Sequence, residues 1–209
     1  MHEGLNQFVR NDVWELTPRP ENVHIIGTKW IFKNKIDEDG EIIRNKSQLV
    51  AQEYTQVEEV DFAESFTPVA RLESIRILIS IACTMNFKLY QMDVKCAFFN
   101  GYLNEEMFVE QPKGFEDPHF PGHMLRLKKT LYGLKQAPRA WYDWLTHYRL
   151  DKGFKKGYAD WTLFVKNDED YLLVAQVYVD DIVYGATIDA WAIEFSEEMK
   201  KEFEMSMVG

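Results

Sequence analysis

Two adjacent carboxylates interrupt the most β-prone stretch of the chain. Residues 172–179 and 182–184 are almost entirely apolar and rich in β-branched and aromatic side chains, and only Asp180 and Asp181 separate them. A two-residue gap between two such runs is typical of a tight β-hairpin. Asp is an ordinary turn residue, but neighbouring carboxylates repel each other and a divalent cation relieves that repulsion. The pair therefore indicates either a plain polar turn or a metal site at the tip of a hydrophobic hairpin.

A third carboxylate, Asp93, directly follows another β-prone run, residues 89–92. If that strand lies beside the 172–184 hairpin, three carboxylates meet at one edge of a sheet. Mg²⁺ prefers oxygen ligands of this kind, and two such ions about 3.5–4 Å apart form the clamp used in phosphoryl transfer. Metal-dependent phosphoryl transfer is thus the functional alternative to three unrelated structural carboxylates.

The remaining sequence alternates between strand and helix periodicity, which predicts an α+β fold with helices packed on an antiparallel sheet. A hairpin is expected over residues 25–54 around the turn Asp37–Gly40, and further strands at 88–94, 107–110, 124–127, 162–166, 171–179 and 182–184. Helices are expected over residues 71–86, from 137 to about 148, and over 191–203. Residues 1–22 are polar and contain Pro18 and Pro20, so we expect an extended arm followed by one domain over residues 23–205.

Charge is distributed unevenly along the 209 residues. The formal net charge of −10 on its own argues against a dedicated nucleic-acid binder. Residues 122–156, however, carry nine basic and two acidic side chains, whereas the segments on either side are acidic. Such a basic block is either a solvated face or a surface for nucleic-acid phosphates.

Cysteine content and hydropathy bear on the cellular environment. Cys83 and Cys96 are too few for a disulfide framework, so free thiols in a reducing compartment are expected. The longest apolar run, residues 77–85, is too short for a membrane span, and the first residues lack the pattern of a secretory signal. We therefore expect no membrane partner and a cytosolic or nuclear location.

Three segments in a fixed order carry a family resemblance. They are Asp93–Gly101 (DVKCAFFNG), Leu131–Tyr142 (LYGLKQAPRAWY) and Tyr178–Gly185 (YVDDIVYG), and residues 27–33 and 66–71 match upstream. Together they closely resemble the reverse transcriptase of copia-type long-terminal-repeat retrotransposons, over roughly residues 14–203. The resemblance implies the fingers and palm of an RNA-directed DNA polymerase. It also implies two Mg²⁺ ions, replaceable by Mn²⁺, as cofactors, and an RNA or DNA template with primer and deoxynucleoside triphosphates as partners.

The resemblance assigns roles to particular residues. The metal ligands and catalytic carboxylates would be Asp93, Asp180 and Asp181, with the Val94 backbone as a further metal ligand. The nucleotide site would be formed by Phe98, as an aromatic gate against a ribose 2′-hydroxyl, Gln136 and Lys46. Nucleic-acid contacts would come from Lys135, Arg139 and Tyr178. Core packing is the alternative role of Phe98, and helix capping is that of Gln136.

The chain also departs from the family pattern. Gln48 stands where a basic residue is usual, so a weaker grip on the nucleotide triphosphate is expected. Glu53 stands where Gly is usual, which adds negative charge near a polyanion path and is expected to strain the hairpin. Cys96 and Phe99 replace the usual Thr and Leu, which repacking is expected to tolerate.

The position of the last residue adds an expectation about completeness. The chain stops soon after the helix that follows the Asp-Asp hairpin, so the thumb is expected to be absent or partial. A fingers and palm segment cut from a longer polyprotein, located in cytoplasmic virus-like particles or in the nucleus, fits this pattern. Three interpretations stay open: an active polymerase core, a catalytically inactive remnant that at most binds nucleic acid or protein, and a host-adopted module whose acidic flanks contact a protein.

Overall fold

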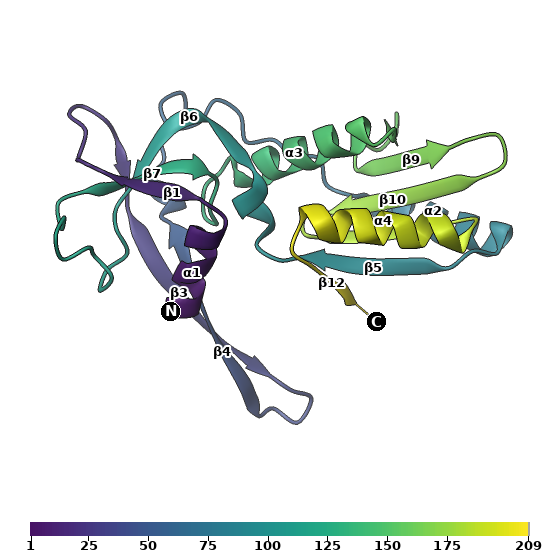
Figure 1. The fold of residues 1–209 in the computed structure, drawn as a ribbon, viewed down its shortest axis with the longest axis horizontal. Helices are drawn as coiled ribbons and strands as arrows, with labels where there is room; N and C mark the ends of the chain where they lie inside the picture. The colour runs from purple at the N-terminus through teal and green to yellow at the C-terminus, as the bar shows by residue number, and fades with distance from the viewer. Residues whose placement is uncertain (209) are drawn as a thin grey trace. The chain divides into compact units, whose positions relative to one another are not determined.

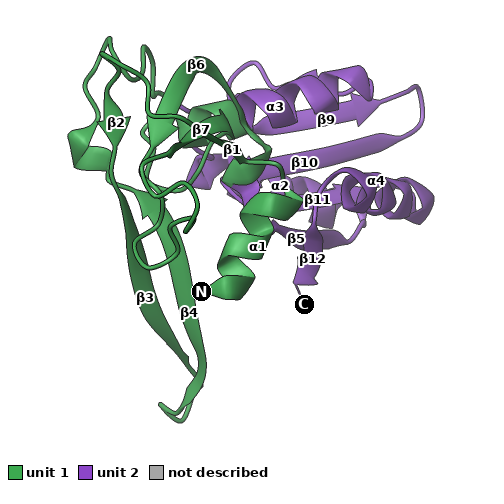
Figure 2. Ribbon diagram, turned by 60° about the vertical axis from the view of Figure 1, so that its left-hand side comes forward, with its two compact units in different colours: residues 1–66, 98–141 green, residues 67–97, 142–209 purple. Residues whose placement is uncertain are grey.

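The computed structural model describes residues 1–208, which form two compact units (Figures 1 and 2). Unit 1 comprises Met1–Phe66 and Phe98–Trp141. Unit 2 comprises Thr67–Ala97 and Tyr142–Gly209, of which residue 209 is not described. Each unit combines two separate segments, so each acquires its core only when distant parts of the chain meet.

Unit 1 contains a four-stranded sheet. Its strands, in spatial order, are β1 (Trp14–Thr17), β7 (Met124–Lys129), β6 (Tyr102–Val109) and β2 (Ile25–Ile26). The β2–β6 pair is parallel and the other pairs are antiparallel. The short segment η2 (Ala97–Asn100) precedes β6.

The prediction of an extended arm over residues 1–22 was wrong. Residues His2–Arg10 form helix α1, and β1 follows it and pairs with β7. The buried Phe8 ring stacks on Trp14 at 4.1 Å between centroids and lies 4.5 Å from the Phe99 ring. Burial of this aromatic cluster attaches the N-terminal residues to the body of unit 1, and so they are not free.

A long hairpin forms a separate two-stranded sheet and projects from the rest of unit 1 (Figure 2). Strand β3 (Thr28–Ile36) pairs antiparallel with β4 (Ile42–Ala51), and the Asp-Gly hairpin predicted from the sequence is confirmed. At its turn, the Asp37 carboxylate accepts the N–H groups of Asp39 and Glu41 at 3.1 and 2.9 Å. After β4 the chain enters the short helix η1 (Glu53–Thr55), so the strand ends earlier than predicted.

Unit 2 is built on a six-stranded antiparallel sheet, flanked by helices (Figure 1). The strands, in spatial order, are β12 (Met205–Val208), β5 (Leu89–Val94), β11 (Asp181–Ala186), β10 (Leu172–Tyr178), β9 (Leu163–Asn167) and β8 (Lys155–Lys156). The helices are α2 (Leu72–Met85), α4 (Asp189–Glu202) and the part of α3 (Ala137–Asp151) that follows residue 141. Tyr184 of β11 and Phe195 of α4 are both buried, with their rings 4.5 Å apart, and so α4 packs on the sheet.

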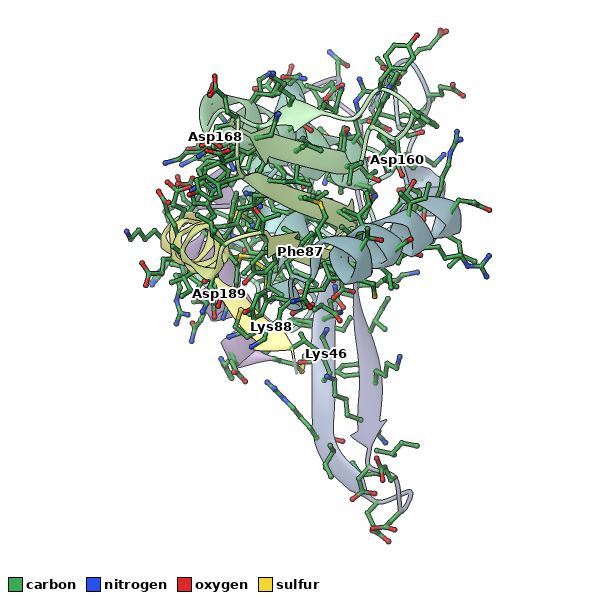
Figure 3. The ribbon with its side chains drawn as sticks, turned by 90° about the vertical axis from the view of Figure 1, so that its right-hand side faces the viewer. Lys46, Phe87, Lys88, Asp160, Asp168 and Asp189 are labelled. Atoms are coloured by element: carbon green, nitrogen blue, oxygen red, sulfur yellow. The ribbon has the colours of Figure 1, made fainter. Side chains whose placement is uncertain are left out.

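Two buried polar groups in unit 2 differ in how well they are satisfied. The Asp160 carboxylate (Figure 3) accepts bonds from the Thr162 N–H at 2.9 Å and hydroxyl at 2.6 Å. Burial raises the pKa of Asp160, but hydrogen bonds from Ser74, Thr162 and the Arg71 backbone outweigh it, so the pKa is lowered. Arg149, in contrast, is 1% exposed, and its Nε and Nη2 have no hydrogen-bond partner among the described residues. Burial lowers the pKa of its guanidinium to about 9.

Neither Cys83 nor Cys96 takes part in a disulfide within residues 1–208. Within residues 1–208, no helix has both the length and the apolar character needed to cross a bilayer.

Candidate functional site

Asp93 and Asp181 lie directly opposite each other at the ends of β5 and β11. Opposite residues of an antiparallel pair present their side chains on the same face, with Cβ atoms about 4.5–5.5 Å apart. The Val94 N–H donates to the carbonyl oxygen of Asp180 at 2.8 Å, which joins the end of β5 to the adjacent turn. The structure therefore places Asp93, Asp180 and Asp181 at the same end of the central strands β5 and β11.

The turn that carries the carboxylates has an unusual backbone. Tyr178 pairs with Asp181, and so Val179 and Asp180 form a two-residue loop. Val179 adopts a φ of 55°, in the left-handed region that a β-branched residue rarely occupies. In a two-residue hairpin loop with positive φ at the first central position, Gly is preferred there. The carboxylates thus sit on a turn that stores backbone strain of about 1–3 kcal/mol, and such strain commonly marks functional sites.

Gln91 is a site residue that the sequence analysis missed. Its Nε2 donates to Oδ1 of Asp181 at 2.9 Å, across from β5 to β11. Gln91 lies two residues before Asp93 on the same strand, so both side chains face the same side of the sheet. The sequence shows that Gln91 and Asp93 share a face of the strand, but only the β5–β11 register shows that Asp181 is the partner of Gln91. A hydrogen bond to an ionised carboxylate is stronger than a neutral one, and here it fixes the orientation of Asp181.

The residue types at this end of β5 and β11 suit a hard divalent cation, because carboxylates offer the oxygen ligands that such a cation prefers. Within residues 1–208, no group of three or more His, Cys, Asp or Glu side chains is already arranged as a metal-binding cluster. Carboxylates without a cation between them repel, which favours separated side chains. The facing pair of Asp93 and Asp181 is therefore the part of the predicted site that the strand register itself fixes.

Unit 1 contains a cavity of about 620 Å³ at the base of the β3–β4 hairpin. Charged and polar residues that line it are Lys29, Gln48, Glu53, Tyr54, Tyr132 and Lys135. The Phe98 ring is half-buried and lies 4.7 Å from the ring of Tyr132. Lys46, predicted for the nucleotide site, is exposed on β4 and is not among the residues that line this cavity.

Gly133 sets one wall of the cavity by a close approach of two backbones. Its φ is 91°, and a Cβ at this position would lie 2.3 Å from the carbonyl oxygen of Ala51. The Ala51 N–H donates to the carbonyl oxygen of Tyr132 at 2.8 Å. A side chain at residue 133 would therefore separate the predicted LYG motif from β4.

Gln136 lies inside a hydrogen-bonded network of unit 1. It is 4% exposed, and its Nε2 donates to the Asp61 carbonyl oxygen at 3.0 Å and to Met107 Sδ at 2.9 Å. Its Oε1 accepts from Gln56 Nε2 at 3.0 Å. The amide is thus committed to protein partners, and contact of Gln136 with a nucleotide stays a prediction.

The basic block over residues 122–156 does not form one cationic surface. Four of its side chains pair with carboxylates: Arg126 with Glu15 and Glu106, Lys128 with Asp12 and Glu15, Arg139 with Glu64, and Lys152 with Glu198. Arg149 is buried. Of the residues predicted to contact nucleic acid, Lys135 lines the cavity, Arg139 also donates to the Phe66 carbonyl oxygen at 3.1 Å, and Tyr178 is 50% exposed.

The chain matches known proteins over nearly its whole length. The model of the family described as reverse transcriptase (RNA-dependent DNA polymerase) matches residues 11–209. The retrovirus-related Pol polyprotein from transposon RE2 of Arabidopsis thaliana is 40% identical over 205 residues, covering 94% of this chain and 14% of that polyprotein. The corresponding polyprotein from transposon RE1 is 41% identical over 184 residues, covering 88% of this chain and 13% of that protein.

A tobacco relative extends the match to the full chain. The retrovirus-related Pol polyprotein from transposon TNT 1-94 of Nicotiana tabacum is 33% identical over 210 residues, covering 100% of this chain and 16% of that polyprotein. The chain thus spans about a seventh of the length of these relatives. The resemblance to copia-type reverse transcriptases, predicted from the three motifs, is confirmed, and the chain belongs to the reverse transcriptase (RNA-dependent DNA polymerase) family.

Proposed function

We propose that this chain is the fingers and palm portion of an RNA-directed DNA polymerase, with unit 1 as the fingers and unit 2 as the palm. The observation that carries the proposal is the facing pair of Asp93 and Asp181, beside the Asp180 turn, in a chain of the reverse transcriptase family. The reaction joins the primer 3′-oxygen to the α-phosphorus of a deoxynucleoside triphosphate. The bond to the β-phosphate oxygen breaks, pyrophosphate leaves, and the hydroxyl proton passes to solvent.

The carboxylates supply the sites for the divalent metals that the family uses. Two Mg²⁺ ions, when bound, neutralise charge at the reacting phosphate and lower the pKa of the primer hydroxyl. Asp93 and Asp181 hold negative charge on one face of the sheet, and Gln91 keeps the Asp181 carboxylate in a fixed orientation. The half-buried Phe98 is proposed to exclude a ribose 2′-hydroxyl.

The proposal is tested by primer extension on an RNA template with Mg²⁺ or Mn²⁺. Asp180→Asn and Asp181→Asn remove one negative charge each while keeping side-chain size. We expect extension by the parent chain and none by either variant. Equal extension by parent and variants would refute the assignment of the carboxylates.

A second candidate is a catalytically inactive remnant, and one observation favours it. Gln48 and Glu53, two of the four departures from the family pattern, both line the unit 1 cavity. A missing cation and an added carboxylate at that wall oppose binding of a triphosphate. Under this alternative the parent chain does not extend a primer, whereas Gln48→Arg combined with Glu53→Gly restores extension. A host-adopted module predicts instead a specific protein partner whose capture is unaffected by the aspartate variants.

A further inference from the structure

The backbone of Phe98 is anchored by the segment that follows β7. Phe98 lies in η2, and its carbonyl oxygen accepts the Gly101 N–H at 3.1 Å and the Thr130 hydroxyl. Thr130 is fully buried, and its own N–H donates to the Gly101 carbonyl oxygen at 2.8 Å. A single threonine therefore fixes both ends of the turn that carries Phe98. With its backbone held in this way, the Phe98 ring is left with rotation about its own side-chain bonds.

The remaining freedom of the Phe98 ring is restricted by Tyr132. The centroids of these two rings lie 4.7 Å apart, with an interplanar angle of 47°. Tyr132 also contacts the ring of Phe99 edge-on, at 5.8 Å between centroids. Phe99 is 4% exposed and packs on the buried Phe8, so it belongs to the unit 1 core. Tyr132 thus connects the half-buried Phe98 ring to side chains that close packing holds in place.

Tyr132 is itself fixed by its backbone. Its carbonyl oxygen accepts the Ala51 N–H at 2.8 Å, and the following Gly133 approaches Ala51 more closely than a residue with a side chain could. The Tyr132 side chain lines the unit 1 cavity, whereas the Gln136 amide from the same sequence motif is buried and bonded to protein groups. The motif residue that the structure joins to the predicted gate is therefore Tyr132.

A steric gate discriminates only as well as its ring is held. Ribose differs from deoxyribose by one hydroxyl group, so a ring that swings aside by the width of one oxygen atom no longer excludes it. Closely packed side chains resist an added atom, because accommodating it forces them out of favourable rotamers. The ring that contacts Phe98 and the hydroxyl that holds its backbone therefore affect selectivity together with Phe98.

We propose that Tyr132 and Thr130 are positioning residues for Phe98, and that they set how strongly the polymerase prefers deoxyribonucleoside over ribonucleoside triphosphates. The inference rests on the proposed polymerase function and on the proposed gate role of Phe98, and it adds the residues that hold the gate. The aromatic ring of Tyr132, and not its hydroxyl, supplies the contact. Both residues act on the ribose through Phe98, so incorporation of a deoxynucleotide is expected to stay close to that of the parent when they are changed.

The test compares the specificity constants, kcat/KM, for adding one deoxynucleotide and the matching ribonucleotide to a primer on an RNA template. Tyr132→Leu removes the aromatic pair, so we expect the ratio of the two constants to fall by roughly 2- to 10-fold, through faster ribonucleotide incorporation. Thr130→Val keeps the side-chain size but removes the hydroxyl, and a loss of roughly 2- to 10-fold is expected here too.

Two control variants separate the ring contact from other effects. Tyr132→Phe keeps the ring and is expected to keep the parent ratio. Tyr158 is a wholly exposed tyrosine of unit 2, so Tyr158→Leu is the matched control and is expected to leave both constants unchanged. If Tyr132→Leu slows both nucleotides by the same factor, the residue is merely structural and the proposal is overturned. An unchanged ratio in Tyr132→Leu overturns it as well.

A double-mutant cycle shows whether Tyr132 acts through Phe98. Phe98→Ala removes the gate ring and is expected to abolish most of the discrimination, and an unchanged ratio in this variant would refute the gate and the inference with it. Without the ring there is nothing for Tyr132 to position. Phe98→Ala combined with Tyr132→Leu is therefore expected to match Phe98→Ala alone. A further fall of the ratio in the double variant would overturn the positioning role.

A second measurement does not depend on catalysis. The compound para-fluorophenylalanine, incorporated in place of Phe98, reports the surroundings of the gate ring by fluorine NMR. We expect Tyr132→Leu to move its resonance toward that of an exposed ring and Tyr158→Leu to leave it in place. An unmoved resonance in Tyr132→Leu refutes the ring contact, whatever the activity. A parent chain that shows the expected resonances but does not extend a primer refutes the polymerase function and leaves the positioning of the ring supported.

Discussion

Removal of the Gln91 side-chain amide is expected to weaken metal binding at the facing pair of Asp93 and Asp181. The amide donates to Oδ1 of Asp181 at 2.9 Å, and Asp181 faces Asp93. A carboxylate offers about four lone-pair positions, so one hydrogen bond leaves the others for a cation. Gln91→Leu keeps a side chain of similar length on the same face of β5 but removes the donor. Asp181 then loses its fixed orientation, and a bound cation must restrict it instead.

The size of the effect follows from the geometry of this contact. A hydrogen bond to an ionised group contributes about 1.5–3 kcal/mol, and the lower half of this range applies because both side chains are half-buried. Loss of a hydrogen bond to a metal-ligating carboxylate lowers metal affinity by roughly 10- to 100-fold, which is about 1.4–2.7 kcal/mol. Both arguments agree on a loss of about 1.5–2 kcal/mol, or roughly 10- to 30-fold in Mn²⁺ affinity.

The assay is Mn²⁺ titration of the intact chain, followed by electron paramagnetic resonance of the free ion. Tyr90→Phe is the control, because Tyr90 is the neighbouring residue of β5 and its side chain faces the other side of the sheet, where its ring stacks on Tyr184. The control is expected to bind Mn²⁺ as the parent does. A Gln91→Leu chain that folds and binds Mn²⁺ with unchanged affinity would refute the positioning role. Primer extension by the same variants then shows whether the lost affinity also lowers the rate.

Three further predictions concern stability. Val179→Gly removes the strain of a β-branched residue in the left-handed region, which stabilises the folded chain by about 1–2 kcal/mol. The extra backbone entropy of Gly in the unfolded chain opposes this by about 0.5–1 kcal/mol. Urea unfolding should therefore show a small net gain in stability of about 0.5–1 kcal/mol, while primer extension falls. The pKa of Asp160 is lower in the folded chain than in the unfolded one, so its contribution to the free energy of unfolding is present above pH about 4 and is lost as pH falls. Asp160→Asn should lower the free energy of unfolding by about 1.5–3 kcal/mol at neutral pH and make it depend less on pH in acid. Arg149→Met should raise the free energy of unfolding by about 1–2 kcal/mol, because the gain from removing a buried charge with unpaired donors exceeds the loss of the ring contacts to Phe195 at 3.9 Å and Phe154 at 5.1 Å. A destabilised variant would contradict this.

Strong local patterns made the central elements predictable. The 172–184 hairpin, the Asp-Gly hairpin and helices α2, α3 and α4 each combine a clear period with a turn or capping signal, and the structure contains all of them. Helix α1 and strand β12 were missed, because their stability comes from distant partners. Phe8 is the buried residue of α1, and the four residues of β12 gain order by pairing with β5. The four residues of β12 are too few for a periodic signal of their own. Helix α1 does have apolar residues at helical spacing, Leu5, Phe8 and Val9, but they lie in a segment whose composition is otherwise polar.

The candidate site likewise contains features that local sequence predicts and features that depend on distant partners. The sequence predicted that Asp93 lies near Asp180 and Asp181 if its strand is next to the 172–184 hairpin. The β5–β11 pairing meets that condition. The role of Gln91 depends on which residue lies diagonally across that pair, and this is a property of register. The burial of Gln136 likewise follows from its distant partners Gln56 and Asp61, which no local pattern relates to it.

Charge gives the sharpest contrast between order along the chain and arrangement in space. The block over residues 122–156 is the most basic stretch of the sequence, yet the fold pairs or buries five of its nine cations. The β3–β4 hairpin has five basic and four acidic residues over Thr28–Ala51, so its net charge is close to zero. Strand alternation nevertheless separates these charges, with the cations on one face and the acids at the turn. Charges on a surface act on a partner only within about 10 Å, so arrangement in space, and not order along the chain, decides which surface is cationic.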